Sequence, residues 1–313
     1  MIVDCHVHTW RYPEHFVKKD VMLRSQPARR KNWSDEQFKQ MFDIPIENYL
    51  KAAEGVIDKA ILVGFAAPDT AGVLVPNDYV REVANQHPDK LEWCCCVIPT
   101  EEGAVEEVER CVKLGAIALG ELAPVLGGYY ANDKRCYPVW ERCQNLGVPV
   151  IIHAGLTQLT PARMKYADLN AIDDIAIDFP DLKLVICHMG YPQYEIGSFL
   201  IQKHANVYGG IEWLASLSGL DRQALSKYNP QVDYAYYFHL IYPLIYHLSQ
   251  TFGEPDKLIF GTDWTESSPR RSIEIFEHIN DLTKKLNLPA IPNQIIHNLL
   301  HENWKKVFKL TER

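Results

Sequence analysis

The feature that most constrains the fold of this 313-residue chain is a series of short apolar segments, each followed by a helical pattern. The segments are rich in Val, Ile and Leu, and they are apolar at consecutive positions rather than at alternate ones. Continuous apolar strands are typical of parallel sheets, because both faces of such a sheet are buried. We expect strands at about 2–8, 59–65, 93–98, 116–122, 148–153, 183–188, 206–211 and 257–263.

Helical patterns separate these strands, at about 45–54, 77–87, 101–114, 136–146, 171–179, 193–204, 236–252 and 269–287. The first residue of one of them, Asn77, is expected to cap its helix, which stops before Pro88. Eight strands, each followed by a helix, predict an α/β fold with the architecture of a (β/α)8 TIM barrel. The seventh unit carries the weakest signal, because its strand, YGGIEW, is short and rich in glycine.

Length favours one large domain over residues 1–313, since α/β barrels often exceed about 250 residues. A hydrophobic content of 47% is ample for its core. Two segments are longer than usual loops: an insertion at about 9–44, after the first strand, and residues 212–235, after the seventh. The C-terminal stretch at about 293–310 is predicted to form an amphipathic capping helix.

Charge and cysteine usage exclude several classes of protein. A net charge of −8 argues against binding to nucleic acid or to an anionic membrane surface. No apolar stretch reaches the ~18 residues of a transmembrane helix, and Met1 leads directly into a strand, which leaves no room for a signal peptide. The eight cysteines include the run Cys94–Cys96 but no CxxC motif, so we expect buried free thiols and a cytoplasmic location.

Two histidines close the first strand, in MIVDCHVH. Because strand side chains alternate, we expect His6 and His8 to share one face, with Cys5 and Val7 on the other. Two ring nitrogens a few ångströms apart suit a cation that prefers nitrogen ligands. The alternative is a pair of strand-end histidines with structural hydrogen bonds, because such a pair is common by chance.

Metal-binding or proton-transferring residues also close four later strands: Glu121 the fourth, His153 the fifth, His188 the sixth and Asp263 the eighth. Catalytic residues of TIM barrels lie at the C-terminal ends of strands, so we expect these side chains to meet the first-strand pair. Taken singly, each has a structural alternative. The histidines could be hydrogen-bonded core residues, the aspartate a helix cap and the glutamate a salt-bridge partner.

The motifs HVH, HAG, HMG and FGTDW, in this order, resemble the amidohydrolase superfamily. More narrowly, the chain is similar to the amidohydrolase-related branch that includes decarboxylases of the aminocarboxymuconate-semialdehyde type. The resemblance covers nearly the whole chain, and it is specific for fold rather than for substrate. It implies a metal-dependent enzyme in which His6 and His8 bind the metal and His153 is a further ligand.

For the other residues the resemblance leaves alternatives. His188 is either a ligand of a second metal or an acid/base group, and Asp263 binds metal and takes a proton from its water. Glu121 resembles the bridging acid of binuclear relatives, which many members of the narrower branch lack. With this glutamate the set could hold two ions, and without it one. Zn²⁺ suits these nitrogen and oxygen ligands, with Mn²⁺ as an alternative.

The resemblance implies a hydrolase that cleaves a small-molecule amide, lactone or ester with a metal-activated water. The alternative is a metal-dependent, non-oxidative decarboxylase (carboxy-lyase) of a small aromatic or unsaturated carboxylic acid. That reaction needs a clamp for the substrate carboxylate, for which the candidates are Arg11, Arg24, Arg29, Arg30 and Arg163. The basic residues of the 9–44 insertion are either a solvated loop or a lid over an anionic substrate. The expected partner is a small molecule, and homo-oligomers are common among such barrels.

Overall fold

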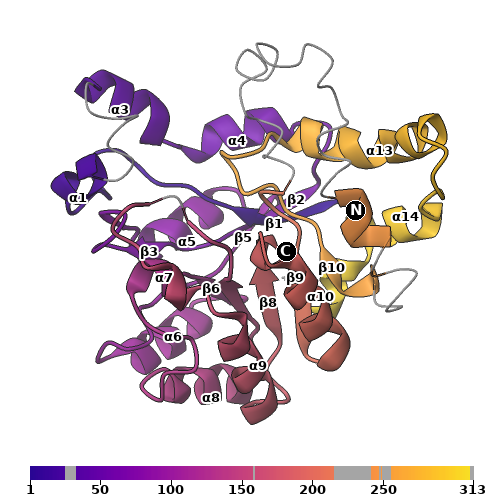
Figure 1. Ribbon diagram of the computed structural model, residues 1–313. Coiled ribbons are helices and arrows are strands. Elements are labelled where there is room, and N and C mark those ends of the chain that lie inside the picture. Colours follow the sequence, from indigo (N-terminus) through magenta and orange to yellow (C-terminus); the bar gives the residue numbers. More distant parts are fainter. Residues whose placement is uncertain (25–32, 158, 215–240, 247, 249–254, 311–313) are drawn as a thin grey trace.

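A computed structural model describes residues 1–24, 33–157, 159–214, 241–246, 248 and 255–310, with parallel strands at the centre and helices around them (Figure 1). The strands of the central layer are β1 (Val3–Val7), β2 (Lys59–Leu62), β5 (Leu91–Trp93), β6 (Leu119–Leu122), β7 (Val150–His153), β8 (Leu184–Cys187), β9 (Val207–Gly210) and β10 (Leu258–Ile259). Each lies within or close to one of the expected strands. The third ends earlier than expected, so that the three consecutive cysteines follow it.

These strands close into a barrel. They form two parallel groups, in the order β1-β2-β5 and β10-β9-β8-β7-β6. Backbone hydrogen bonds join the groups at both seams: the Cys5 N–H donates to the Phe260 carbonyl at 3.1 Å, and the Cys95 N–H donates to the Ala118 carbonyl at 3.1 Å. The TIM-barrel prediction is therefore confirmed.

Helices cover the outside of the barrel (Figure 1). They are α4 (Ile46–Ala53), α5 (Asn77–Gln86), α6 (Ala104–Lys113), α8 (Tyr137–Leu146), α9 (Leu169–Asp178), α10 (Tyr194–Lys203) and α13 (Pro269–Lys285). They match seven of the expected helices, and most of the eighth, at 236–252, lies outside the described residues. The expectation that Asn77 caps α5 is wrong: Pro76 holds the cap position. The Asn77 amide instead bonds the Cys96 backbone, at 2.8 and 3.0 Å.

Shorter elements occupy the loops. The 9–44 insertion holds α1 (Lys19–Arg24) and α3 (Asp35–Phe42), and later loops hold β3 (Ala66–Ala67), β4 (Val73–Leu74), α7 (Pro124–Gly127), η1 (Met164–Tyr166), η2 (His188–Gly190) and η5 (Pro255–Lys257). Arg29, Arg30 and Lys31 lie outside the described residues, and so does the side chain of Arg24. The proposed lid over an anionic substrate therefore stays a prediction.

The expected capping helix at 293–310 is divided into α14 (Asn293–His301) and η6 (Asn303–Lys306). It breaks where the buried Asn303 amide donates to the carbonyls of Pro255 and Leu258, at 3.3 and 2.9 Å. These bonds hold the chain beneath the start of β10. The next residues enter the barrel core rather than continue the helix.

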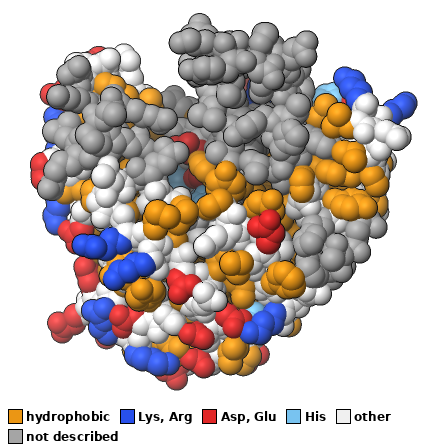
Figure 2. All heavy atoms as spheres, viewed as in Figure 1, with side chains coloured by type: hydrophobic (Ala, Val, Ile, Leu, Met, Phe, Trp, Pro, Cys, Tyr) orange, Lys and Arg blue, Asp and Glu red, His pale blue; other side chains and the backbone are white. Residues whose placement is uncertain are grey.

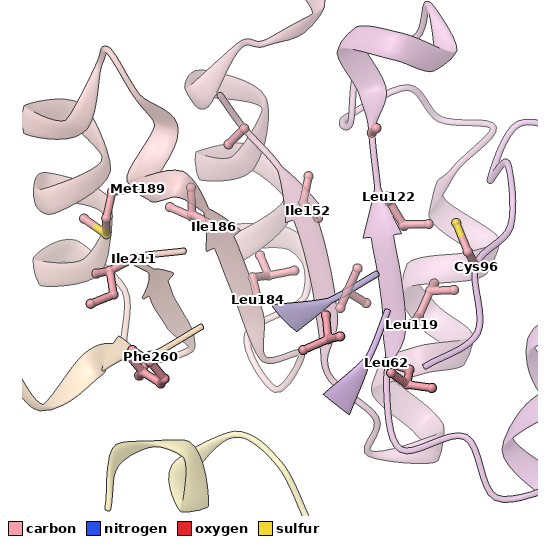
Figure 3. Close-up of a cluster of buried hydrophobic side chains, with 14 of the residues drawn as sticks. Leu62, Cys96, Leu119, Leu122, Ile152, Leu184, Ile186, Met189, Ile211 and Phe260 are labelled. Carbon is pink, nitrogen blue, oxygen red and sulfur yellow. The ribbon is translucent and has the colours of Figure 1, made fainter. Parts of the chain in front are cut away.

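Two layers of apolar side chains result from the alternation along the strands. The inner layer fills the barrel with Val3, Cys5, Ile61, Val63, Cys94, Ala118, Ile151, Val185, Cys187, Tyr208 and Ile259, and Trp304, Val307 and Phe308 close it from the C-terminal segment. The outer layer, between strands and helices, includes Leu62, Leu119, Leu122, Ile152, Leu184, Ile186 and Phe260 (Figure 3). Neighbouring residues such as Ile151 and Ile152 thus belong to different layers.

Two strands break this alternation. In β6, Leu119 and Leu122 both pack in the outer layer although they are three residues apart, because the register against β7 shifts between them. The other strand is β1. Val7 packs in the outer layer, whereas Cys5 packs in the inner one, so the expectation that they share a face is wrong. The cause is a register shift between β1 and β2 that falls between Asp4 and Val7.

The cysteine and surface predictions can also be compared with the structure. All eight cysteines are buried and free of disulfides. Within the described residues, no helix is both long and apolar enough to cross a membrane. On the face shown in Figure 2, Lys and Arg are interspersed with Asp and Glu rather than gathered into a basic patch.

A small polar cluster ties α6 to the start of α5. Glu107 accepts hydrogen bonds from Arg110 Nε at 2.7 Å and from Asn77 Nδ2 at 2.8 Å. The bond from Arg110, with that from Asn77, lowers the pKa of Glu107 from 4.5 to about 2. A group whose pKa is lower in the folded state stabilises the fold above its unfolded-state pKa and loses that effect as the pH falls.

We therefore expect E107Q to lower the free energy of unfolding at neutral pH, by under about 1 kcal/mol because the cluster is partly exposed. The difference from wild type should shrink between about pH 4.5 and pH 2. Urea unfolding at several pH values measures it, with E106Q as the control, since Glu106 is an exposed neighbour on the same helix. A difference that does not depend on pH would contradict the assignment.

Candidate metal centre

The structure brings all six predicted site residues together at the C-terminal ends of the strands. They are His6 and His8 at the end of β1, Glu121 on β6, His153 at the end of β7, His188 directly after β8, and Asp263 after β10. Their side chains form two donor groups that share one carboxylate.

The first donor group is built on the histidine pair of β1. The Nε2 atoms of His6 and His8 lie 3.3 Å apart, and Glu121 Oε2 lies 3.6 and 3.4 Å from them. Asp263 Oδ1 completes the group, 3.8 Å from His6 Nε2 and 3.5 Å from His8 Nε2. The two imidazole nitrogens thus lie close to one oxygen from each of two carboxylates.

The second donor group is built on the next two histidines along the chain. His153 Nδ1 lies 2.8 Å from Glu121 Oε1 and 3.2 Å from His188 Nε2. His188 Nε2 is 3.5 Å from the same glutamate oxygen. The two oxygens of Glu121 therefore face different donor groups.

The donor sets suit divalent cations. Four ligands about 2.1 Å from a tetrahedral zinc ion lie about 3.4 Å from one another. Separations of 3.3–3.6 Å among His6, His8 and Glu121 in the first group fit this spacing. Imidazole and carboxylate ligands are taken by zinc and by manganese alike, so the donor types do not select one metal.

The charge of the site also favours cations. Glu121 and Glu212 are 2% exposed and Asp263 is 8% exposed. Among the described residues, every ion pair of these three carboxylates is with a histidine rather than with Lys or Arg. Burying carboxylates without a positive partner costs free energy, and a bound cation would remove that cost.

The histidine pKa values reflect this field. Burial lowers the pKa of His6, but Glu121, Glu212 and Asp263 outweigh it and raise the pKa to about 10. Burial also lowers the pKa of His188. The hydrogen bond to Glu121, with the charges of Asp263 and Glu212, outweighs burial and raises this pKa to about 9. Burial raises the pKa of Glu121, but the neighbouring histidines hold it well below its ordinary value. A field that holds protons on these nitrogens also attracts a metal ion.

A buried aspartate fixes β1 against the segment that carries Asp263. Asp4 accepts hydrogen bonds from the Thr262 N–H and hydroxyl, at 2.9 and 2.7 Å, and from the Tyr49 hydroxyl at 3.0 Å. Its burial raises its pKa to about 6 in spite of these bonds. Together with the backbone hydrogen bond from Asp263 to His6 at 3.0 Å, this network sets the geometry of the first donor group.

Sequence reasoning missed Glu212. This buried residue follows β9, and its Oε1 accepts a hydrogen bond from the His188 N–H at 3.0 Å. The rule that identified the other site residues, an acid or histidine at a strand end, applies to it as well. The signal was available in YGGIEW, but the strand itself was the least certain of the eight.

Comparisons with known proteins identify the family of this chain. A family model described as amidohydrolase matches residues 3–310. Among curated proteins, the dihydroorotase of Helicobacter pylori strain P12 is 25% identical over an alignment 189 positions long, which covers 54% of this chain and 53% of that protein. The match thus spans about half the length of the curated relative.

Solved structures share the fold. An uncharacterised TIM-barrel protein from Bordetella bronchiseptica has a TM-score of 0.65 and 19% identity, with 98% of this chain and 97% of that one covered. A probable 2-pyrone-4,6-dicarboxylic acid hydrolase from Acinetobacter baumannii has a TM-score of 0.60 and 16% identity, with 98% of each chain covered. A dihydroxybenzoic acid decarboxylase from Polaromonas sp. JS666, with bound manganese and the inhibitor 2-nitroresorcinol, has a TM-score of 0.61 and 14% identity, with 100% and 98% covered.

At such low identities the structural likeness establishes the fold, whereas the family model covers nearly the whole chain and its site motifs. The chain therefore belongs to the amidohydrolase family, and it is an enzyme.

Proposed function

We propose that this chain is a metal-dependent hydrolase that cleaves a small-molecule amide, lactone or ester. The observation that carries the proposal is the Glu121 carboxylate, whose two oxygens face two separate donor groups. Such an arrangement suits a pair of ions, which is a common way of activating water in hydrolases. The names of two relatives, a dihydroorotase and a pyrone dicarboxylic acid hydrolase, support this class of reaction.

The two donor groups divide the ligands between two ions. His6, His8 and Asp263 would hold one ion, His153 and His188 would hold the other, and Glu121 would contact both. Zn²⁺ is our first choice and Mn²⁺ the alternative. When bound, the ions would lower the pKa of a water molecule and polarise the carbonyl group under attack.

The proton transfers would fall to Asp263. Its side chain is 12% exposed, against 3% for Glu121, so it is the more accessible carboxylate of the first donor group. It would accept a proton from the attacking water and pass it to the leaving group. His188 has its Nε2 between His153 and Glu121, which favours a ligand over a free acid/base group.

The arginines that could hold a substrate carboxylate give the decarboxylase alternative less support than the donor groups give the hydrolase. The Nε of Arg11 is hydrogen-bonded to Asp43 at 2.8 Å, and Arg163 is an exposed residue. Arg29 and Arg30, like the side chain of Arg24, lie outside the described residues.

We expect the purified, metal-loaded protein to hold about two divalent ions per chain. Removal of the ions with a chelator should abolish activity, and Zn²⁺ or Mn²⁺ should restore it. E121Q should lose at least one equivalent, because one carboxylate serves both donor groups. Elemental analysis after dialysis measures the content, and a wild-type protein with one ion or none would contradict the two-ion site.

D263N should lower kcat by about 10²–10⁴-fold, because the amide cannot accept the proton. It should still bind metal, since His6, His8 and Glu121 remain within 4.8 Å of one another. D173N is a matched control, because Asp173 is bonded to Lys203 on the outer helices. If D263N kept more than about a tenth of the wild-type kcat, Asp263 would not be the proton acceptor.

The reaction class can be tested with a panel of lactones, cyclic and linear amides, esters and aromatic carboxylic acids. In ¹⁸O-labelled water, we expect a product acid that carries the label, because water supplies the new oxygen. Release of CO₂ without incorporation of ¹⁸O would overturn the hydrolase proposal in favour of a decarboxylase. Mass spectrometry of the product and a CO₂ assay distinguish the two directly.

A further inference from the structure

Glu212 contacts histidines of both donor groups without belonging to either. It follows β9, and its side chain is 3% exposed. One carboxylate oxygen, Oε1, accepts the hydrogen bond from the His188 N–H at 3.0 Å and lies 3.7 Å from His6 Nδ1. Its backbone carbonyl lies 3.3 Å from His188 Nδ1.

The carboxylate also lies 3.9 Å from His188 Nδ1. The ring contacts, at His6 Nδ1 and His188 Nδ1, are on the side of each ring that faces away from the donor groups, and the hydrogen bond at 3.0 Å holds the His188 backbone. An imidazole whose Nδ1 proton is directed at an acceptor presents the lone pair of Nε2 on its other side. For His6 and His188, Nε2 is the atom that enters the donor groups. Glu212 thus faces the outer nitrogen of one histidine in each group.

The other two histidines are not supported in this way. The buried Nδ1 of His8 and the buried Nε2 of His153 have no hydrogen-bond partner among the described residues. Each of these two rings nevertheless directs its other nitrogen at Glu121. The rings backed by Glu212 are therefore the better oriented of each pair.

The backbone around Glu212 leaves space for its carboxylate. A Cβ atom on Gly210 would overlap both carboxylate oxygens and would lie 2.6 Å from Cδ of Glu212. A Cβ on Gly261 would lie 3.2 Å from the Glu212 Cβ and 3.0 Å from the His6 Cβ. Gly210 does not have a left-handed φ, so its backbone would accept alanine, and only the carboxylate requires glycine there.

We propose that Glu212 is a positioning residue that sets the ring nitrogens of His6 and His188 for metal binding in both donor groups, with Gly210 as the space that admits its carboxylate. The inference rests on the two-ion site proposed above. It adds a second residue that connects the two donor groups. Glu121 is a donor in both groups, whereas Glu212 contacts one histidine of each group and is a donor in neither.

A positioning role differs from a purely structural one in what the conservative variant restores. Without metal, Glu212 is a third buried carboxylate beside Glu121 and Asp263, and the described ion pairs of all three are with histidines. Because Glu212 faces histidines whose pKa it raises, its removal should lower the stability of the metal-free fold at neutral pH whichever role it has. With metal present, its removal should weaken binding.

The test is a titration of Co²⁺ into metal-free protein, followed by visible absorption and by calorimetry. We expect E212A to weaken the binding of both ions by about 10–100-fold, the range found when residues behind metal ligands are removed. E212Q should lose less than about 10-fold, because its amide oxygen can still accept the hydrogen bond from the His188 N–H. E92Q is the matched control, since Glu92 is also 2% exposed but pairs with Lys59 on the barrel.

Substitution of Gly210 provides a second, independent test of the proposal. G210A should reproduce the loss seen in E212A, and the double variant G210A/E212A should bind no more weakly than E212A alone. Thermal unfolding of the metal-free proteins at neutral pH should give E212Q and E212A a similar fall in Tm, because both remove the charge that faces the histidines. If E212A fails to fold, E212Q and G210A still test the proposal.

Three results would overturn the inference. In the first, E212A and G210A bind both ions as tightly as wild type. In the second, E212Q weakens Co²⁺ binding as much as E212A does, so that an oxygen able to accept the hydrogen bond from the His188 N–H restores nothing. The third is an additional equivalent of Co²⁺ with thiolate charge-transfer absorption, because Cys187 Sγ lies 3.9 Å from His6 Nδ1 and would then be a ligand. A wild-type protein that binds no Co²⁺ would instead remove the two-ion proposal itself.

Discussion

The burial of one carboxylate between two pairs of imidazoles governs the rest of this site. Glu121 is 2% exposed and faces a histidine pair with each of its oxygens. Its negative charge is tolerated only because the histidines, or ions bound by them, supply positive charge at close range. The elements that carry these histidines must therefore hold their ends at one place to within ångströms, and the barrel is the scaffold that does so.

The barrel achieves this by closure. Hydrogen bonds at both seams make each strand a neighbour of two others, so the strands that carry the histidines cannot separate independently. Asp4 accepts two hydrogen bonds from Thr262 and so fixes β1 to the segment after β10, beside the first donor group. The geometry of the site at the C-terminal ends of the strands thus depends on hydrogen bonds within the sheet.

Much of this arrangement could be predicted from the sequence, because apolar runs and the residues that end them are local signals. His153, His188 and Asp263 each stand directly after such a run, and parallel strands in a barrel bring those positions together. The separate roles of the Glu121 oxygens could not be predicted, since they depend on side-chain rotamers. The inward position of Cys5 depends on a register shift, and the cap at Asn77 was lost to a tertiary contact with Cys96. Glu212 was missed because its glycine-rich strand gave a weak pattern.

The C-terminal segment has a consequence for how the molecule is made. Trp304, Val307 and Phe308 close the inner layer of the barrel, although they are among the last residues of this sequence. A ribosome releases a nascent chain from its N-terminus onward, so these side chains emerge after the strands that precede them in the sequence. The barrel interior is therefore sealed only after every histidine of the candidate site has left the ribosome.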